Sequence, residues 1–592
     1  MGKPAGWTAV LLGIAGLAIA NLASARLAAQ TVPPAVPPIA PQIAVPTRDQ
    51  VQPPVPPTAP PRASIDSRNS FAATPCALAG SPLRVGIDRI RFAPLGRPAL
   101  PLQVAAILNG VAPAVTGDQP IENVCEIRDR ANAALRRAGY VASVQIPPQE
   151  ITTGELALAV VMARITEIRV RGEPGPHAAM LARRLDRIRG LDPLNEREIE
   201  RLLLLAGDVP GLDVQLSLRP AGTAPGDVIG DVSITSARFA LFGNVQNYGS
   251  RQLGRETGYA RGEIYGLLTG ADMLYVAGSS TLDFREQQVA QIGYTTGLGA
   301  AGTTLGVRAT HAWSRPDLDT LDLRSRTLIA GFDIGQPVLR SVDSNLTVGG
   351  GFELLEQKTQ VFGGAAPSPL NQDKLRVVFA RMSGNYRIPR AGGGDLFALG
   401  GSIEVRKGLA ILGASQAGVT TSEGFTLSRF EGDPQAVVVR ANLDAELGLG
   451  RLFRIAGQAR GQWANHPLVN LEEYAIGNLS IGRGYDPGSN AGDRAIGLRG
   501  EPRLRLPLDL PVVIEVLGFF DAVWLRNLDS NTTEARRTLT AWGGGLNVQL
   551  PGRLSLELLY AKPRNKALSL DKAPPAGRLL VSLTARFSPN AR

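Results

Sequence analysis

The stretch IGRGYDPGSNAGD, residues 481–493, contains the side chains best suited to one specific interaction. Glycines flank a single arginine, an aromatic ring follows at once, and a glycine–aspartate pair ends the stretch. Glycine reaches backbone conformations that other residues avoid, so the chain can bend tightly around the arginine. A guanidinium held in this way is suited to a directional, bidentate ion pair with a carboxylate. The candidate residues are Gly482, Arg483, Gly484, Tyr485, Gly492 and Asp493.

Patterns that would indicate catalysis or cofactor binding fail in this sequence. Residues 477–482 (GNLSIG) have phosphate-loop spacing, but Arg483 and Gly484 follow where lysine and serine or threonine are required. The sequence has neither a G-x-S-x-G elbow nor an H-E-x-x-H motif. Its three histidines are scattered, and together with two cysteines they have no metal-ligand spacing. The sequence therefore predicts no enzyme, no cofactor and no metal site.

The charge of the chain does not indicate a nucleic-acid partner. The 592 residues carry a formal charge of +10, but the arginines are spread along alternating segments. A nucleic-acid-binding protein would concentrate lysine and arginine in blocks or interleave them with aromatic residues. We expect contact with anionic lipid headgroups or an acidic partner instead.

The first 75 residues read as an export signal and a linker. Lys3 precedes a short apolar run, and small residues follow, so residues 1–29 are predicted to be a signal peptide rather than a membrane anchor. Residues 30–75 are dense in proline, which favours a semi-rigid periplasmic linker. A plug entering a pore is the alternative for this segment. In an exported chain, two cysteines suggest one structural disulfide.

Two small α+β modules are predicted next, over residues 76–163 and 164–235. Strand-like alternation over residues 85–94, two helical segments and two further strands give the order β-α-α-β-β in the first module. The same order recurs in the second module. Two consecutive modules with one pattern form an internal structural repeat, although their sequences do not visibly repeat.

The remaining residues, 236–592, show segments of period-two alternation separated by turn residues. This pattern is typical of an outer-membrane β-barrel, and sixteen strands would each receive about 22 residues with their connections. A soluble β-sandwich or propeller is the alternative, but no repeated blade motif supports it. Residues 512–524 place Glu515, Leu517, Phe519 and Asp521 on one face, opposite Ile514, Val516, Phe520 and Trp524. The second set is predicted to face lipid and the first set the lumen.

Together these features resemble an outer-membrane transporter of two-partner secretion (the TpsB type), in which two periplasmic POTRA domains precede a sixteen-stranded barrel. The Gly-Arg-Gly-Tyr and Gly-Asp residues are similar to the family's Val-Arg-Gly-Tyr motif, with Gly482 in place of valine. Phe519-x-Asp521 matches the family's F-x-D motif. The stretch AGYVASVQIPPQEITTGELAL resembles the signature of the first POTRA domain, which implies a substrate-binding role for Tyr140, Val141, Val144, Gln149 and Gly154.

The resemblance implies further expectations about the site. It places the arginine motif in a loop, near residues 475–505, that folds back into the lumen, and it pairs Arg483 with Asp521. Glu515 is the rival partner on the same strand face. It also implies a disulfide between Cys76 and Cys125 in the first POTRA domain. Relatives have a glycine where this chain has Ala163, and their N-terminal plug helix is not recognisable in this sequence.

The function implied is a pore in the Gram-negative outer membrane, with its POTRA domains in the periplasm. It would recognise one secreted exoprotein (a TpsA-like adhesin, haemolysin or β-helical filament) and translocate it unfolded without ATP. Such a barrel would contact outer-membrane lipid and lipopolysaccharide. A barrel-assembly insertase is the alternative, and a passive porin would leave the two modules without a role.

Overall fold

The computed structural model describes residues 45–52, 65–66, 76–111, 117–151, 154–318, 321–364, 366–390, 393–508, 511–530, 532–550 and 554–589. The predicted signal peptide and most of the predicted linker lie outside these ranges. None of the helices in the described ranges is both long and apolar enough to cross a bilayer.

The first module folds as a three-stranded sheet covered by two helices. Parallel pairing joins β3 to β6, antiparallel pairing joins β6 to β5, and β2 pairs with β4 separately. The strand expected over residues 85–94 is divided, since β2 and β3 occupy its two halves. The elements are β2 (Arg84–Gly86), β3 (Arg89–Leu95), α3 (Leu102–Asn109), β4 (Asp118–Pro120), α4 (Asn123–Arg137), β5 (Ala142–Gln145) and β6 (Glu155–Met162).

The second module has the predicted order β-α-α-β-β. Asn195 caps its second helix, because the asparagine side chain accepts a hydrogen bond from the Arg197 amide. The elements are β7 (Arg164–Arg171), η3 (Gly175–His177), α5 (Ala178–Arg189), α6 (Glu196–Gly207), β8 (Leu212–Pro220) and β9 (Asp227–Ser236). A two-residue strand from the linker region, β1 (Ile65–Asp66), pairs in parallel with β8 at the edge of this sheet.

A disulfide joins Cys76 to Cys125, which lies in α4, and their Cα atoms are 5.9 Å apart. It closes a loop with a sequence separation of 49 residues. Replacing both cysteines by serine is expected to lower the free energy of unfolding of the first module by about 4 kcal/mol, because the unfolded chain gains loop entropy. Thermal unfolding of the oxidised protein and of the double serine variant measures this difference. An unchanged melting temperature would contradict the prediction.

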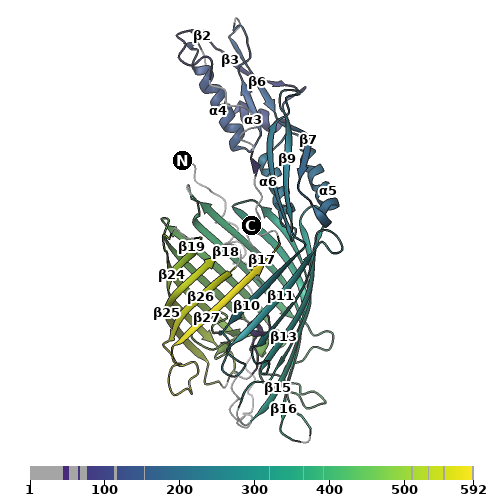
Figure 1. The fold of residues 1–592 in the computed structure, drawn as a ribbon, viewed down its shortest axis with the longest axis vertical. Helices are drawn as coiled ribbons and strands as arrows, with labels where there is room; N and C mark the ends of the chain where they lie inside the picture. The colour runs from purple at the N-terminus through teal and green to yellow at the C-terminus, as the bar shows by residue number, and fades with distance from the viewer. Residues whose placement is uncertain are drawn as a thin grey trace, which may run out of the picture. The chain divides into compact units, whose positions relative to one another are not determined.

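Sixteen antiparallel strands then close into a barrel (Figure 1). Each strand pairs with the next along the chain, except that β20 pairs with β23, and β10 closes the ring against β27. The strands are β10 (Phe239–Gln246), β11 (Thr257–Tyr265), β12 (Asp272–Thr281), β13 (Gln287–Leu298), β14 (Thr303–Ser314), β15 (Asp322–Arg340), β16 (Ser344–Phe362), β17 (Ser368–Pro389), β18 (Asp395–Gly408), β19 (Val437–Leu449), β20 (Phe453–Ala464), β23 (Arg494–Arg505), β24 (Val513–Arg526), β25 (Arg536–Leu550), β26 (Leu554–Pro563) and β27 (Arg578–Phe587).

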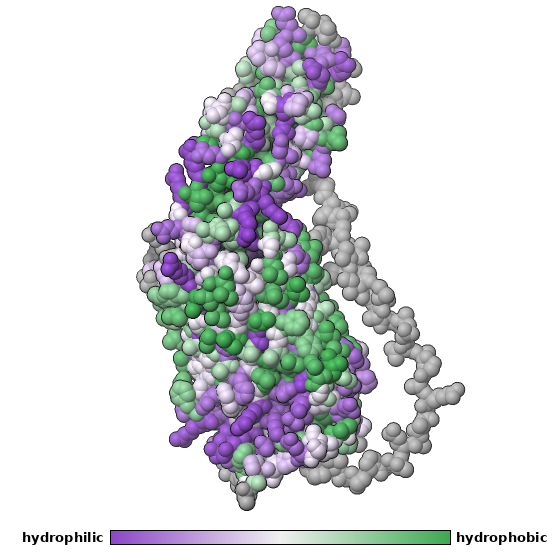
Figure 2. All heavy atoms as spheres, turned by 90° about the vertical axis from the view of Figure 1, so that its right-hand side faces the viewer, coloured by the Kyte–Doolittle hydropathy of each residue, from purple (hydrophilic) through white to green (hydrophobic). Residues whose placement is uncertain are grey.

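Side chains alternate between the two faces of the barrel wall, as predicted. On β24 the exposed fractions are 39% for Val516 and 48% for Phe520, whereas Phe519 and Asp521 are 5% and 0% exposed. Lipid-facing and lumen-facing positions alternate in this way in transmembrane barrels. Figure 2 shows the result on one side of the barrel, where a hydrophobic belt is bordered by hydrophilic residues.

The lumen loop is shorter than the sequence predicted. Residues 494–505, which we expected to continue the loop to 505, form β23 of the barrel wall. In this strand apolar residues such as Ile496 and Leu498 face outward and are 57% and 44% exposed. Glycines and charged residues stand between them. Apart from Arg494, most of the charged residues face inward, so the segment resembles a loop in composition although it has the period of a strand.

Candidate functional site in the barrel lumen

A hairpin between β20 and β23, residues 465–493, fills part of the lumen. It contains η4 (Asn470–Glu472) and a two-stranded ribbon in which β21 (Tyr474–Ala475) pairs with β22 (Ala491–Gly492). The chain turns between these strands, and Gly482 and Gly484 have φ angles of +113° and +90°. These left-handed angles explain the glycines that flank Arg483.

Asp521, on the inward face of β24, is the carboxylate to which the hairpin is anchored. Its Oδ2 atom accepts hydrogen bonds from the backbone amides of Gly482 at 3.0 Å and Arg483 at 2.9 Å. Arg499 on β23 donates to both carboxylate oxygens, each at 2.9 Å. Asp521 is fully buried, and charge-assisted bonds of this kind are stronger than neutral ones.

The Arg483 side chain has a second carboxylate partner that the sequence did not reveal. Its Nη1 atom donates to Glu501 on β23 at 2.8 Å, whereas its Nη2 atom is 3.4 Å from Asp521. The guanidinium also lies over the ring of Phe519, 3.5 Å from the centroid, where cation–π attraction adds to the ion pairs. Arg483 and Asp521 are therefore brought together, as part of a network rather than as an isolated pair.

Glu515, the rival partner, belongs to a different group. Its carboxylate pairs with Arg454 on β20. The alternation of Arg499, Glu501 and Arg503 along β23 is the sequence signal that could have revealed the wider network, because residues two apart in a strand share a face.

Tyr485 fixes the tip of the hairpin against the neighbouring wall. Its ring is fully buried, and its hydroxyl is 3.1 Å from the carbonyl oxygen of Thr540 and 2.9 Å from that of Asn565. The ring of Pro563 lies so close to Gly484 that a Cβ atom there would be 2.7 Å from it. Tyrosine and glycine thus hold the turn close to β25 and β26.

Asp493, at the end of the motif, binds a second loop. Its carboxylate accepts hydrogen bonds from the Arg429 guanidinium at 2.5 and 3.2 Å and from the Leu468 amide at 2.7 Å. Arg429 lies in the connection between β18 and β19, and it also pairs with Glu473 at 2.8 Å and with Asp529. The motif aspartate therefore joins the base of the hairpin to another loop.

A short N-terminal segment also lies in the lumen, where the sequence predicted a periplasmic linker. It contains α2 (Arg48–Val51). Arg48 pairs with Glu353 on the inward face of β16 at 2.7 Å and with Glu472 of the hairpin at 3.0 Å. The plug alternative thus describes this part of the chain better, although the helix is too short to show an amphipathic pattern.

The two glutamates that bind Arg48 belong to a buried charge cluster. Arg406 on β18 is 1% exposed and pairs with Glu353 at 2.7 Å and with Glu472 at 2.9 Å. Arg440 on β19 pairs with Glu472 at 2.9 Å. Arg48 therefore completes a network that already links the wall to the hairpin.

The predicted substrate-binding residues of the first module have structural roles. Tyr140, Val141 and Val144 are buried, and the Gln149 side chain exchanges two hydrogen bonds with the backbone of Ala157 in β6. Gly154 has a φ of +69°. β5 is an edge strand of this sheet, and the Asn132 side chain bonds to both the amide and the carbonyl of Val144 there.

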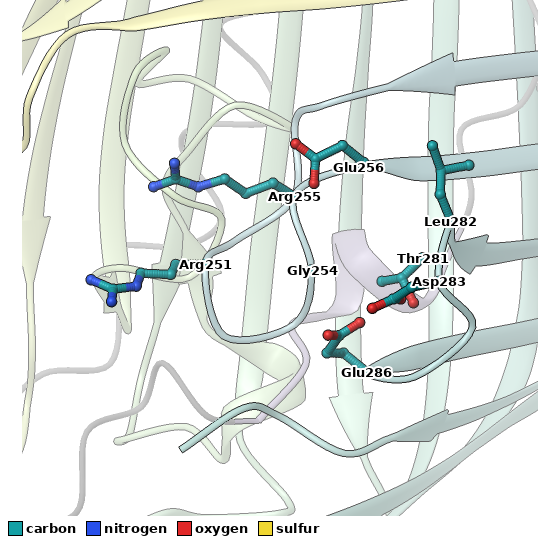
Figure 3. A pocket seen from close by; sticks show the side chains of 8 residues that line it. All are labelled: Arg251, Gly254, Arg255, Glu256, Thr281, Leu282, Asp283 and Glu286. Atoms are coloured by element: carbon teal, nitrogen blue, oxygen red, sulfur yellow. The ribbon is translucent and has the colours of Figure 1, made fainter. Parts of the chain in front are cut away.

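An open cavity of about 560 Å³ lies between the β10–β11 and β12–β13 connections (Figure 3). Arg251 and Arg255 line one side of it, and Asp283 and Glu286 lie together on the other. The sequence did not single out these residues, and the charge network around Arg483 does not include them.

The sequence is similar to those of known outer-membrane secretion proteins. The model of the haemolysin secretion/activation proteins ShlB/FhaC/HecB matches residues 231–549, more than half of the chain. The heme/hemopexin transporter protein HuxB of Haemophilus influenzae is 22% identical over 460 residues, which cover 75% of this chain and 78% of HuxB. The outer membrane transporter CdiB-2 of Burkholderia pseudomallei is 25% identical over 377 residues, 61% of this chain and 60% of CdiB-2.

Solved structures share the fold. CdiB from Escherichia coli has a TM-score of 0.66 at 17% identity and covers 88% of this chain and 94% of its own. CdiB from Acinetobacter baumannii has a TM-score of 0.61 at 16% identity, with coverages of 89% and 95%. The barrel and the family match agree, and the chain therefore belongs to the ShlB/FhaC/HecB family and is a two-partner secretion transporter of the Gram-negative outer membrane.

Proposed function

We propose that this transporter exports one secreted exoprotein, an adhesin, haemolysin or β-helical filament, as an unfolded chain through the barrel lumen. The observation that carries the proposal is the way in which the lumen is occupied. The hairpin and the N-terminal segment are both held against the wall by ion pairs and hydrogen bonds, and the two cysteines of the chain are paired elsewhere, so no disulfide locks them in place. Contacts of this kind can break and re-form, so the same elements can block the lumen and yield to a client.

The energy for export would come from the client. The sequence has no nucleotide-binding motif, and a chain that folds outside the cell cannot slide back. The transporter then needs only a barrier that yields, which the lumen contacts supply. Family membership favours this function over the insertase alternative.

Capture of the client would fall to the two modules. An extended chain can add as a strand to a sheet edge, where backbone hydrogen bonds give affinity without requiring a folded partner. Two strands suit this role, β5 at an edge of the first module's sheet and β8, which in the second module's sheet is bordered on one side only by the two-residue strand β1. Both are partly covered, β5 by the Asn132 side chain and β8 by the linker strand β1, so a client would displace contacts of the chain itself.

Removal of both modules tests whether the modules capture the client while the barrel only lets it pass. A variant lacking residues 76–235 is expected to insert as a barrel and to secrete nothing, because the client is no longer captured. Export of candidate exoproteins from the source genome is measured in the medium, and heat-modifiability gels on the same membranes show insertion. Undiminished export by the inserted barrel would place capture outside the modules.

A further inference from the structure

The outward face of the barrel carries a row of arginines at the end of β23, β24 and β25 that is nearest the lumen hairpin. Arg494 lies directly opposite Arg526, and Arg526 lies directly opposite Arg536. Their outward direction follows from the two-residue period, because Ile496, Trp524 and Trp542 on the same faces are 57%, 43% and 47% exposed. β24 and β25 run side by side in Figure 1.

Three like charges in adjacent strands are unfavourable without a counterion. Residues opposite each other in an antiparallel pair are about 5 Å apart, and like charges at this spacing destabilise the pair. Arg494 is partly compensated, since it donates to the Ala464 carbonyl at 2.8 Å and lies 5.3 Å from the Trp463 ring centroid. In the described part of the chain the side chains of Arg526 and Arg536 make neither a hydrogen bond nor an ion pair, and both residues are exposed.

On the opposite side of the barrel, basic side chains at the same end of the strands form ion pairs with carboxylates of the chain itself. On β15 and β16, Arg324 and Lys358 have acidic partners, whereas Arg326, which lies opposite Lys358, has no ion pair with a described residue. Arg324 pairs with Asp322 at 2.9 Å, and Lys358 pairs with Glu423 at 3.2 Å. On that side two of the three basic residues have a carboxylate partner, whereas Arg526 and Arg536 have none among the described residues, so an anion that neutralises them would come from outside the described part of the chain.

The level of the row within the membrane identifies that anion. Tryptophans of a transmembrane barrel mark the boundary between hydrocarbon and headgroups. Trp524 and Trp463 lie beside the arginines and are 43% and 46% exposed. The loops at this end of the strands, including the one that carries Asp529, lie at the opposite end of each strand from the turn before Phe239, where the second module joins. The arginines thus stand at the headgroup level of the outer leaflet.

We propose that the row Arg494, Arg526 and Arg536 binds the phosphate groups of lipopolysaccharide. Guanidinium groups bind phosphate bidentately, and the acyl chains of the same lipid would cover the apolar residues on the membrane side of the row. A bound phosphate removes the repulsion along the row and braces β23 and β24, the two strands that supply Arg499, Glu501 and Asp521 to the lumen site.

Titration of the delipidated full-length protein in detergent with bisphosphorylated lipid A tests this proposal. Each basic residue near an anionic lipid surface contributes about fivefold in affinity, so the double variant Arg526→Gln with Arg536→Gln should bind about 25-fold more weakly. The single variant Arg536→Gln, which perturbs the barrel less, should lose about fivefold. The matched control, Arg324→Gln with Lys358→Gln on β15 and β16, should bind as the unaltered protein does. Heat-modifiability gels verify folding in every case.

Two further probes separate the possible sources of the anion. Dephosphorylated lipid A is expected to bind as weakly to the unaltered protein as lipid A binds to the double variant. Inorganic phosphate at the same concentration is expected not to compete with lipid A. Equal lipid A binding by the double variant and the unaltered protein would overturn the site. Equal competition by inorganic phosphate would overturn the assignment to a lipid.

Discussion

Replacing Asp521 by alanine is expected to abolish secretion of the partner while the barrel still inserts. The change removes both oxygens that receive Arg499 and the Gly482 and Arg483 amides. It leaves the Arg499 guanidinium without its carboxylate, and breaking a buried charge pair costs about 3–5 kcal/mol. Lumen water can reduce this cost, but the hairpin also loses two backbone hydrogen bonds. Secretion into the medium and heat-modifiability of the same membranes measure the two effects separately.

The network geometry makes this prediction more specific. Arg483→Ala should reduce secretion less than Asp521→Ala, because the two backbone amides still reach Asp521. An exchange of charges, Arg483→Asp with Asp521→Arg, would restore an isolated pair but should fail here, since Arg499 and Glu501 then face like charges. Glu515→Gln on the same strand is the matched control and should secrete normally, because Glu515 pairs with Arg454. Normal export by Asp521→Ala would contradict the anchoring role of this carboxylate.

Reversing the charge of Arg48 is expected to open the pore. Arg48→Glu places a carboxylate beside Glu353 and Glu472, which now bind the guanidinium at 2.7 and 3.0 Å. The loss of the pairs and the new repulsion should disfavour the docked segment by about 3 kcal/mol or more, a shift of over 100-fold in its occupancy. Single-channel recordings in planar bilayers should show a larger mean conductance than for the unaltered protein.

Two further variants serve as comparisons for the conductance of Arg48→Glu. Arg48→Gln removes the charge without adding a new one and should give an intermediate conductance. Lys407→Glu makes the same charge reversal next to Arg406, but at an exposed position outside the lumen network, and it should leave conductance unchanged. Equal conductance of Arg48→Glu and the unaltered protein would show that the segment is held by other contacts.

The parts of the fold with a strong period were predictable from the sequence. Alternation predicted the inward face of β24, and helical spacing predicted the two helices of the second module, α5 and α6. The division of 85–94 into two strands was missed, because the pattern of alternation continues across Gly86 to Asp88. β23 was assigned to the loop, since Gly497 interrupts its inward face, Gly500 interrupts its outward face, and the outward residues begin with Arg494.

Within the candidate site, the sequence predicted only the contact between residues of two recognised motifs. The proximity of Arg483 and Asp521 followed from the resemblance and the strand face. Arg499 and Glu501 were missed, because a charge on an inward face acquires a partner only when the hairpin is docked. Arg48 was missed for the same reason, as a single arginine in a proline-rich segment carries no local sign of a lumen partner. Contacts between distant segments depend on the closed barrel and not on any local period.

Two neighbouring carboxylates in the hairpin have a joint consequence. Glu472 receives Arg48 of the N-terminal segment, and Glu473 receives Arg429 of the β18–β19 connection. A client that displaced Arg48 would therefore remove an ion pair from the short turn that also holds the β18–β19 connection, and movement of that connection would in turn weaken the binding of Arg48. Under the proposed function the two segments would be released together, so that the lumen opens only while a client occupies it and the outer membrane keeps its permeability barrier between rounds of export.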